Sequence, residues 1–221
     1  MYKSFGYPEF NASGEQILTT YNNEYSNMLM DIRVYKIKAD EERIFCREGE
    51  EIAILLLAGK ITYIFDGQEK TVSRKDVFTE GPWCVHVCSN TKVIVKANSD
   101  AEILVQCTKN EKQFPAKLYA PKDVPWGYSC AGKFGNTAQR QVNTIFDYDT
   151  APYSNMVLGE VINDRGNWSG YLPHYHPQPE VTISNLIDQK VLVLVLSEMM
   201  YLKALMVVLP LSLTAKLIHK L

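Results

Sequence analysis

Histidine is scarce in this chain, with only four among 221 residues. The five cysteines are an odd number without the paired spacing of zinc sites, which argues against a disulfide framework and against structural zinc. No charged-then-apolar segment opens the chain, so nothing resembles a secretory signal. These absences together predict a reducing, cytoplasmic compartment.

A strong charge of one sign is also missing. The net charge is −2, and acidic and basic residues are interspersed, so neither a nucleic-acid footprint nor a polybasic membrane surface is indicated. We therefore expect a small-molecule partner, no nucleic acid and no membrane, and the sequence leaves a homo-oligomer open. The hydrophobic fraction of 46% is ample for one large β domain or two small ones.

Two of the four histidines, His174 and His176, stand together, and Glu180 follows closely. Side chains alternate along a strand, so both imidazoles can point into one cavity. The prolines at 177 and 179 predict that this strand ends and that Glu180 begins a new one. Glu180 can then return opposite the imidazoles.

Two imidazoles and a carboxylate suit a borderline divalent ion such as zinc, iron, manganese or nickel. Three protein ligands also leave positions open for water or substrate. The alternative interpretation is a pair of polar residues on a half-solvated strand. The scarcity of histidine elsewhere and the turn prolines favour the metal site.

The third histidine, His86, lies between Cys84 and Cys88. Alternate residues share one face of a strand, but Cys-x-His-x-Cys is an unusual zinc pattern. A lone histidine on a strand is more often packed or hydrogen-bonded. We therefore expect strand packing here and no metal.

The first half of the chain reads as a series of short strands separated by turn residues, which indicates a sandwich or barrel. Gly59 is predicted to turn a buried apolar run, and Asp66-Gly67 is a strong hairpin signal. A linker is predicted over 109–127. The predicted strands are 32–37, 51–57, 61–65, 70–72, 83–87, 92–96 and 101–107 in the first half, and 141–146 and 156–162 in the second.

The stretch from Gly166 to His176, Gly-Asn-Trp-Ser-Gly-Tyr-Leu-Pro-His-Tyr-His, followed by Pro-Glu-Val, resembles the signature of the 5-deoxy-glucuronate isomerase family of inositol catabolism. More distantly, the chain looks like the 5-keto-4-deoxyuronate isomerases. The resemblance covers the chain from near its start to about Val181. Supporting segments are Arg-Lys-Asp-Val-Phe at 74–78, Arg-Gln-Val at 140–142 and Leu-Gly-Glu-Val at 158–161.

The resemblance implies an all-β bicupin, that is, two jelly-roll β-barrels of which the second binds the metal. On this basis we expect an N-terminal cupin without metal ligands over 1–120, the start of a metal-binding cupin over 121–181, and an aberrant apolar tail over 182–221. The family binds its metal through two histidines, a glutamate and a later histidine. The resemblance maps the first three of these ligands onto His174, His176 and Glu180. The implied reaction is an aldose–ketose isomerisation of a sugar acid, in which a divalent ion stabilises an enediolate. The catalytic base is not identified.

The last forty residues contain no glycine, no phenylalanine and one proline, unlike the expected end of a jelly roll. Three interpretations are open: a reading-frame error or natural frameshift that has replaced and shortened the end of the second cupin, a membrane segment, and a divergent C-terminal helix or strand pair packed on the barrel. Charges within the apolar run argue against the membrane segment. His219 is the only downstream histidine, and its surroundings do not resemble those of the fourth family ligand.

An altered C-terminus also leaves other functions open. The alternatives to the isomerase are a non-catalytic cupin module for sugar binding or oligomerisation, the related 5-keto-4-deoxyuronate isomerase, and another metal-cupin chemistry such as dioxygenation.

Overall fold

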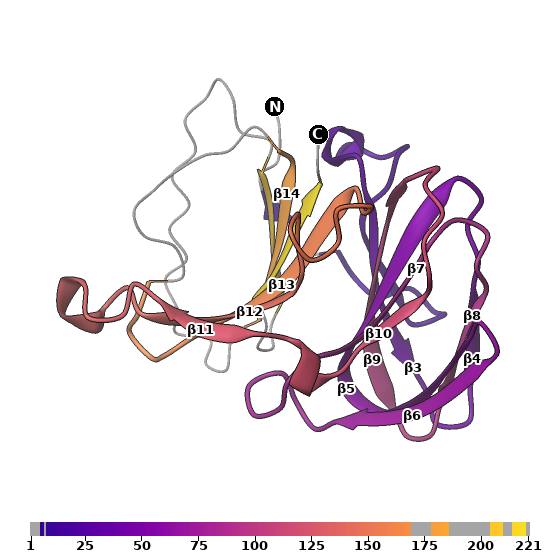
Figure 1. Cartoon of the computed structure of the whole chain (residues 1–221), viewed down its shortest axis with the longest axis horizontal. Helices are drawn as coiled ribbons and strands as arrows, with labels where there is room; N and C mark the ends of the chain where they lie inside the picture. The colour runs from indigo at the N-terminus through magenta and orange to yellow at the C-terminus, as the bar shows by residue number, and fades with distance from the viewer. Residues whose placement is uncertain (1–4, 7, 169–177, 186–203, 210–213, 220–221) are drawn as a thin grey trace.

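The computed structural model describes residues 5–6, 8–168, 178–185, 204–209 and 214–219 (Figure 1). Within these ranges the chain forms β-strands and three short 3-10 helices, and it contains no α-helix. The predicted all-β class is therefore confirmed. The 3-10 helices are η1 (Ser26–Met28), η2 (Pro121–Asp123) and η3 (Phe134–Asn136).

The first unit consists of two sheets that share one long strand, β5 (Glu50–Phe65). One sheet has the order β10-β7-β5-β9-β3-β2, and the other joins β4 to β8 and both β8 and β6 to β5. The bounds of the remaining strands are β2 (Glu15–Thr19), β3 (Asp31–Ile37), β4 (Glu42–Phe45), β6 (Gln68–Arg74), β7 (Trp83–Val87), β8 (Val93–Ala97), β9 (Ala101–Lys109) and β10 (Lys117–Tyr119).

Gly59 does not turn the chain, as the sequence had led us to expect. It lies inside β5 with φ 105°, just after a register shift between Leu56 and Ala58. This positive φ favours glycine, and it lets β5 leave the first sheet and enter the second without ending. The hairpin at Asp66-Gly67 is confirmed: both residues have positive φ, and the strands pair on either side of them.

The predicted linker over 109–127 is partly regular structure. β10 pairs with β7, η2 follows, and β11 (Trp126–Ser129) begins the next sheet. Short polar segments with several prolines carry little periodicity, so the three-residue strand β10 gave no signal in the sequence.

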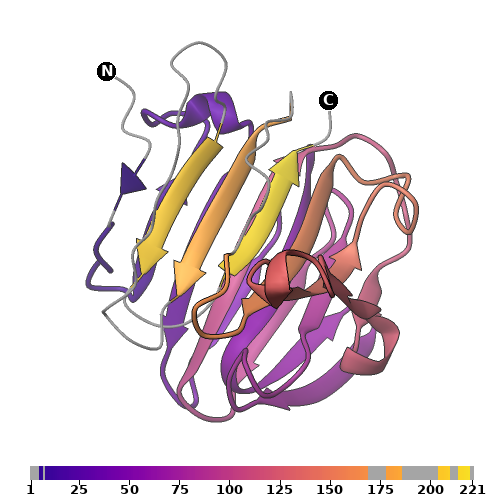
Figure 2. The ribbon, with the colours of Figure 1, turned by 90° about the vertical axis from the view of Figure 1, so that its left-hand side faces the viewer.

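The second unit is a seven-stranded sheet with the order β1-β15-β14-β16-β13-β12-β11. Figure 2 views this sheet in front of the first unit. β1 comes from the N-terminal arm and pairs in parallel with β15. The bounds are β1 (Phe5–Gly6), β12 (Arg140–Phe146), β13 (Met156–Asn163), β14 (Glu180–Asn185), β15 (Ala204–Leu209) and β16 (Thr214–His219).

The C-terminal segment therefore contributes strands to this sheet. β14 continues past residue 181, where the aberrant tail was expected to begin, and β15 and β16 pair on either side of it. Of the three interpretations of the tail, the strand pair is the one seen in the described ranges. No helix in the described part of the chain is long and apolar enough to cross a membrane. A frameshift in the gene stays a prediction.

The sheet with the order β10-β7-β5-β9-β3-β2 lies between two cores and is buried on both faces. This explains the unbroken apolar run of β5. Alternate residues of that run, such as Ile54 and Leu55, belong to two different cores. The core that contains Ile54 fills the first unit between its two sheets. The core that contains Leu55 also holds Phe146, Leu158 and Ile183 of the second unit, so it joins the two units.

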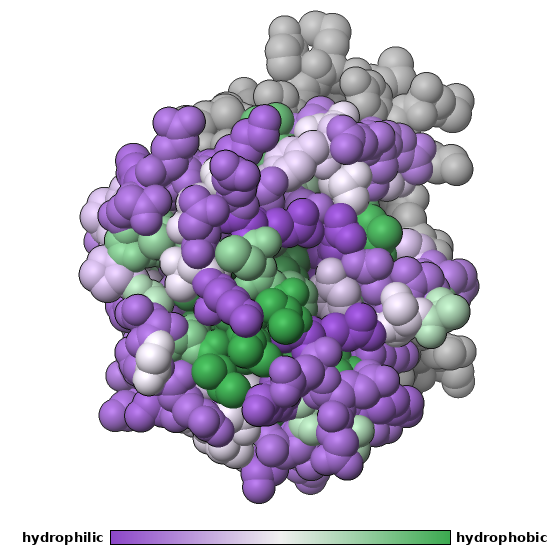
Figure 3. Space-filling view, turned by 90° about the vertical axis from the view of Figure 1, so that its right-hand side faces the viewer, coloured by the Kyte–Doolittle hydropathy of each residue, from purple (hydrophilic) through white to green (hydrophobic). Residues whose placement is uncertain are grey.

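The outer face of the β4–β8 sheet has a row of isoleucines. The register sets Ile44 opposite Ile94 and Ile94 opposite Ile64, and Ile44 is 59% exposed. Figure 3 views the side of the molecule on which β4 and β8 lie, and it shows an apolar patch among mainly hydrophilic side chains. This face is thus the solvent side of the first unit.

Candidate metal-binding region and the interface behind it

Glu180 begins β14, as the prolines before it predicted. Along this strand Val181 and Ile183 are buried in the core between the two units. Glu180 and Thr182 alternate with them and therefore lie on the face turned away from the first unit. Glu180 is half-buried, and its Oε1 accepts a hydrogen bond from Thr182 Oγ1 at 3.0 Å. Strand alternation thus places a carboxylate on the outer face of a sheet whose inner face is fixed by packing.

The other two predicted ligands, His174 and His176, lie outside the described residues. Among the described residues, no group of three or more His, Cys, Asp or Glu side chains could hold a metal ion. In the strand register, Ile218 of β16 is the residue opposite Glu180. His219, the next residue of β16, lies opposite Met156 of β13. The ligand set His174, His176 and Glu180 therefore stays a prediction.

The start of the family-like stretch is held against an earlier loop. The backbone N–H of Trp168 donates to the Thr137 carbonyl at 2.8 Å, and the Asn167 side chain donates to the Gln139 carbonyl at 2.9 Å. Gly166 has φ 80° and lies in the turn that follows β13. These contacts fix where the chain leaves β13 on its way to the candidate ligands.

Behind the sheet, Arg74 and Glu160 form a fully buried ion pair. The two guanidinium NH groups lie 2.7 and 2.8 Å from the two carboxylate oxygens, and both side chains are 0% exposed. Arg74 also donates to the carbonyls of Leu56 and Glu80. A bidentate, desolvated pair of this kind fixes orientation as well as distance, so it sets the position of β13 on the first unit.

A second polar contact crosses the same interface. His86 Nε2 is hydrogen-bonded to Glu51 Oε2 at 2.8 Å, and Glu51 Oε1 accepts the backbone N–H of Asn155 at 2.6 Å. The His86 ring stacks on Phe146 with a centroid distance of 4.4 Å and an interplanar angle of 4°. His86 is thus a packed, hydrogen-bonded residue between the units, as expected for the Cys84-x-His86-x-Cys88 segment. None of the five cysteines, all of which lie in the described ranges, forms a disulfide.

Sequence reasoning assigned no role to Arg74, Glu160 or Glu51. A charged residue inside an apolar run, as at Glu160 in β13, signals a buried partner. It does not say which residue the partner is, because Arg74 lies 86 positions away.

Comparisons with known proteins cover most of this chain. A model of the KduI/IolB family matches residues 7–188 and therefore extends beyond Val181. The 5-deoxy-glucuronate isomerase of Bacillus subtilis (strain 168) is 31% identical over 144 residues, which cover 63% of this chain and 51% of that protein. The 5-deoxy-glucuronate isomerase of Lacticaseibacillus casei is 27% identical over 183 residues, which cover 80% of this chain and 66% of that one. The chain spans about half the length of the Bacillus relative that it matches.

Solved structures share the fold. An IolB-like protein from Salmonella typhimurium LT2 superposes with a TM-score of 0.64 at 19% identity, covering 73% of this chain and 60% of that one. The Escherichia coli protein Ylba superposes with a TM-score of 0.56 at 14% identity, covering 80% and 69%. At these identities the likeness concerns the fold alone.

Proposed function

Because the chain belongs to the KduI/IolB family, we propose that it is a metal-dependent sugar-acid isomerase that converts 5-deoxy-glucuronate to 2-deoxy-5-keto-gluconate in myo-inositol catabolism. The observation that carries this proposal is the position of Glu180, the last of three closely spaced candidate ligands, on the outer face of the second sheet. The curated relatives named 5-deoxy-glucuronate isomerase support the choice of reaction. We also propose a cytoplasmic location and a small sugar acid as the partner.

The donor set suits a borderline divalent ion, since it combines two imidazoles with one carboxylate. When bound, such an ion would act as a Lewis acid that polarises a carbonyl and its neighbouring hydroxyl. Glu180 would hold the ion together with His174 and His176. The hydrogen bond from Thr182 orients the Glu180 carboxylate for this role.

The buried interface supports the same proposal. Ligands must hold their geometry closely, and β13, to which Glu160 belongs, is tied to the first unit through Arg74. β16 lies between β13 and β14, so the backbone ladder connects this anchor to Glu180. The second sheet is thus a rigid support for the candidate ligands.

The test is an isomerase assay on the purified chain after separate loading with zinc, manganese, iron and nickel. We expect turnover of 5-deoxy-glucuronate, and a loss of about 100-fold or more in Glu180→Gln and in His174→Ala. Glu69→Gln, which removes an exposed carboxylate from β6, is the matched control and should keep full activity. The metal content should fall together with activity in Glu180→Gln and His174→Ala and should stay unchanged in Glu69→Gln. Full activity in His174→Ala would end the proposal.

Two outcomes would point to the alternatives. Turnover of 5-keto-4-deoxyuronate in preference to 5-deoxy-glucuronate would assign the chain to that related reaction. Thermal stabilisation by one of the two acids, with no turnover of either acid, would identify a non-catalytic sugar-binding module.

A further inference from the structure

A pocket opens where the two sheets of the first unit separate, far along the chain from the candidate metal ligands. β2 is the last strand of its sheet, and β4 pairs only with β8, so no ladder joins β4 to β2 or β3. The pocket between them has a volume of about 300 Å³. It is lined by Ser13, Glu15 and Tyr35 on one side and by Arg43, Ile44, Phe45, Cys46 and Arg47 on the other.

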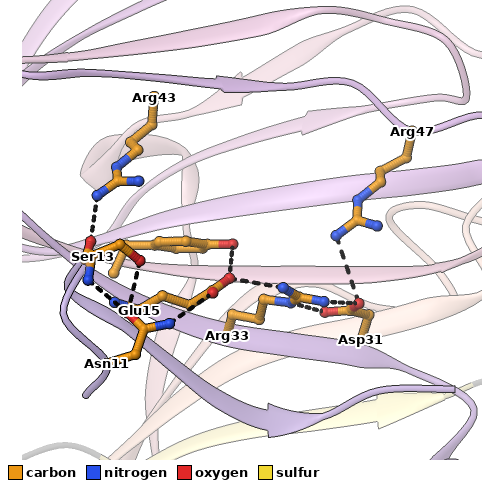
Figure 4. A network of polar contacts seen from close by, with 8 residues as sticks. Asn11, Ser13, Glu15, Asp31, Arg33, Arg43 and Arg47 are labelled. Atoms are coloured by element: carbon orange, nitrogen blue, oxygen red, sulfur yellow. Dashed lines mark hydrogen bonds and ion pairs between the residues drawn. The ribbon is translucent and has the colours of Figure 1, made fainter. Parts of the chain in front are cut away.

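The carboxylates beside this pocket are already paired (Figure 4). Arg33 donates to Glu15 at 2.7 Å and, through two of its nitrogens, to Asp31 at 2.6 and 2.8 Å. Tyr35 donates its hydroxyl hydrogen to Glu15 at 2.9 Å. The Arg33 guanidinium therefore offsets half of the charge of these two carboxylates, and the neutral Tyr35 phenol adds a hydrogen bond to Glu15.

Two further arginines keep donors for a ligand. Arg43 donates to the backbone carbonyl of Ser13, a neutral partner, and makes no ion pair with any residue that the structure describes. Arg47 forms a long ion pair with Asp31 at 3.6 Å, beyond hydrogen-bond distance, so its N–H groups are not used in this contact; its side chain is 39% exposed. Burial raises the pKa of Glu50, the other carboxyl that faces Arg47. Each guanidinium has five N–H groups, so Arg43 above all can still receive an anion in a bidentate manner.

Between the two arginines the pocket wall is aromatic. The Tyr35 and Phe45 rings meet edge to face with centroids 5.4 Å apart, and the Arg43 guanidinium lies 5.9 Å from the Tyr35 centroid. An aromatic face can pack against the C–H groups of a sugar ring. The Ser13 hydroxyl and the Tyr35 phenol provide hydrogen-bonding partners for its hydroxyl groups.

We propose that this pocket binds a small sugar acid, with its carboxylate on Arg43 and Arg47 and its ring against Tyr35 and Phe45. The site belongs to the first unit, for which the sequence had led us to expect a cupin without metal ligands. It does not depend on the proposed isomerase, because none of its residues comes from the second sheet.

Cys46 allows a direct test, since it is exposed and lines the pocket. A bound ligand should shield its thiol from iodoacetamide, and mass spectrometry can follow the rate of alkylation. The probe is D-glucuronate, used with a chelator in the Glu180→Gln chain so that the candidate metal site does not contribute. With a Kd of about 1 mM, about 10 mM glucuronate should slow Cys46 alkylation roughly tenfold. The rate at Cys130, outside the pocket, should not change.

Variants and other probes complete the design. Arg43→Gln should remove the protection, whereas Lys70→Gln, which removes an exposed charge from β6, should keep it. Comparing each variant with and without glucuronate corrects for any change in intrinsic thiol reactivity. No protection of Cys46 by glucuronate, or equal protection by glucose, would overturn the proposal. Equal protection by inorganic phosphate would also overturn it, since the pocket would then be a general anion site.

Discussion

Breaking the buried ion pair between Arg74 and Glu160 should destabilise the protein strongly, although neither residue is a candidate ligand. Glu160→Gln keeps the side-chain shape but removes the only carboxylate paired with Arg74 in the described structure. Arg74 would keep its bonds to two backbone carbonyls, yet its charge would stay buried without a counter-charge. Removing one partner of such a pair costs about 3–5 kcal/mol. That is a large part of the roughly 5–15 kcal/mol by which a typical native domain is stable.

The opposite change should cost more. Arg74→Met leaves the Glu160 charge buried and also removes the donor to the Leu56 and Glu80 carbonyls, and each buried unpaired carbonyl adds about 1–3 kcal/mol. The double variant with Arg74→Met and Glu160→Leu contains no buried charge at this position. It should therefore lose less stability than the sum of the two single variants, with the carbonyl cost remaining.

The assay is urea unfolding followed by circular dichroism, with the free energy of unfolding and the m value compared across the variants. Glu42→Gln is the control, because it breaks the half-exposed ion pair with Lys96 at 3.4 Å and should change the free energy of unfolding by less than about 1 kcal/mol. A cost of less than about 1 kcal/mol for Glu160→Gln at an unchanged m value would refute the reasoning. Strict additivity in the double variant would refute it as well.

Three further predictions concern the first unit. Burial acts to raise the pKa of Glu15, but hydrogen bonds led by the one from Arg33 lower this pKa overall below the ordinary 4.5. The ionised Glu15 carboxylate therefore stabilises the folded protein, and this stabilisation is lost as pH falls through the folded-state pKa. Glu15→Gln should flatten the dependence of Tm on pH in the acid range. Gly59→Ala should cost about 2 kcal/mol or more in urea unfolding, since φ is 105° and the new Cβ would lie 2.5 Å from a backbone oxygen. Iodoacetamide should label exposed Cys46 in the folded protein, whereas Cys84, whose thiol pKa is raised by burial, should be labelled only after unfolding.

The strands of the first unit could largely be predicted, because their periodicity is local. β3 and β7 follow the predicted bounds closely, and Asp66-Gly67 adopts the expected hairpin turn. The short strands β2, β4 and β10 were not predicted. β5 was wrongly divided at Gly59, since a glycine inside an apolar run has the same sequence signature whether the chain turns or continues between two sheets. Only the pairing partners on both sides of Gly59 distinguish these two cases.

The candidate site was predictable only in its local part. Prolines before Glu180 correctly predicted that a strand begins there, because proline acts within a residue or two of its position. The partners of Glu160 and Glu51 were not predictable, since each contact joins residues far apart in the chain. The pocket around Arg43 was missed for the same reason: its walls come from strands that only the fold brings together.

These observations give the first unit a part in any chemistry of the second. The shared core and two polar contacts, one at Glu160 and one at Glu51, fix the inner face of the second sheet, while Glu180 lies on its outer face. Packing on one face restricts the backbone, so side chains on the other face have a stable frame from which to act. The first unit can therefore influence how the candidate ligands of the second unit are positioned. The coupling should appear experimentally as weaker metal binding in Glu160→Gln under conditions in which that variant remains folded.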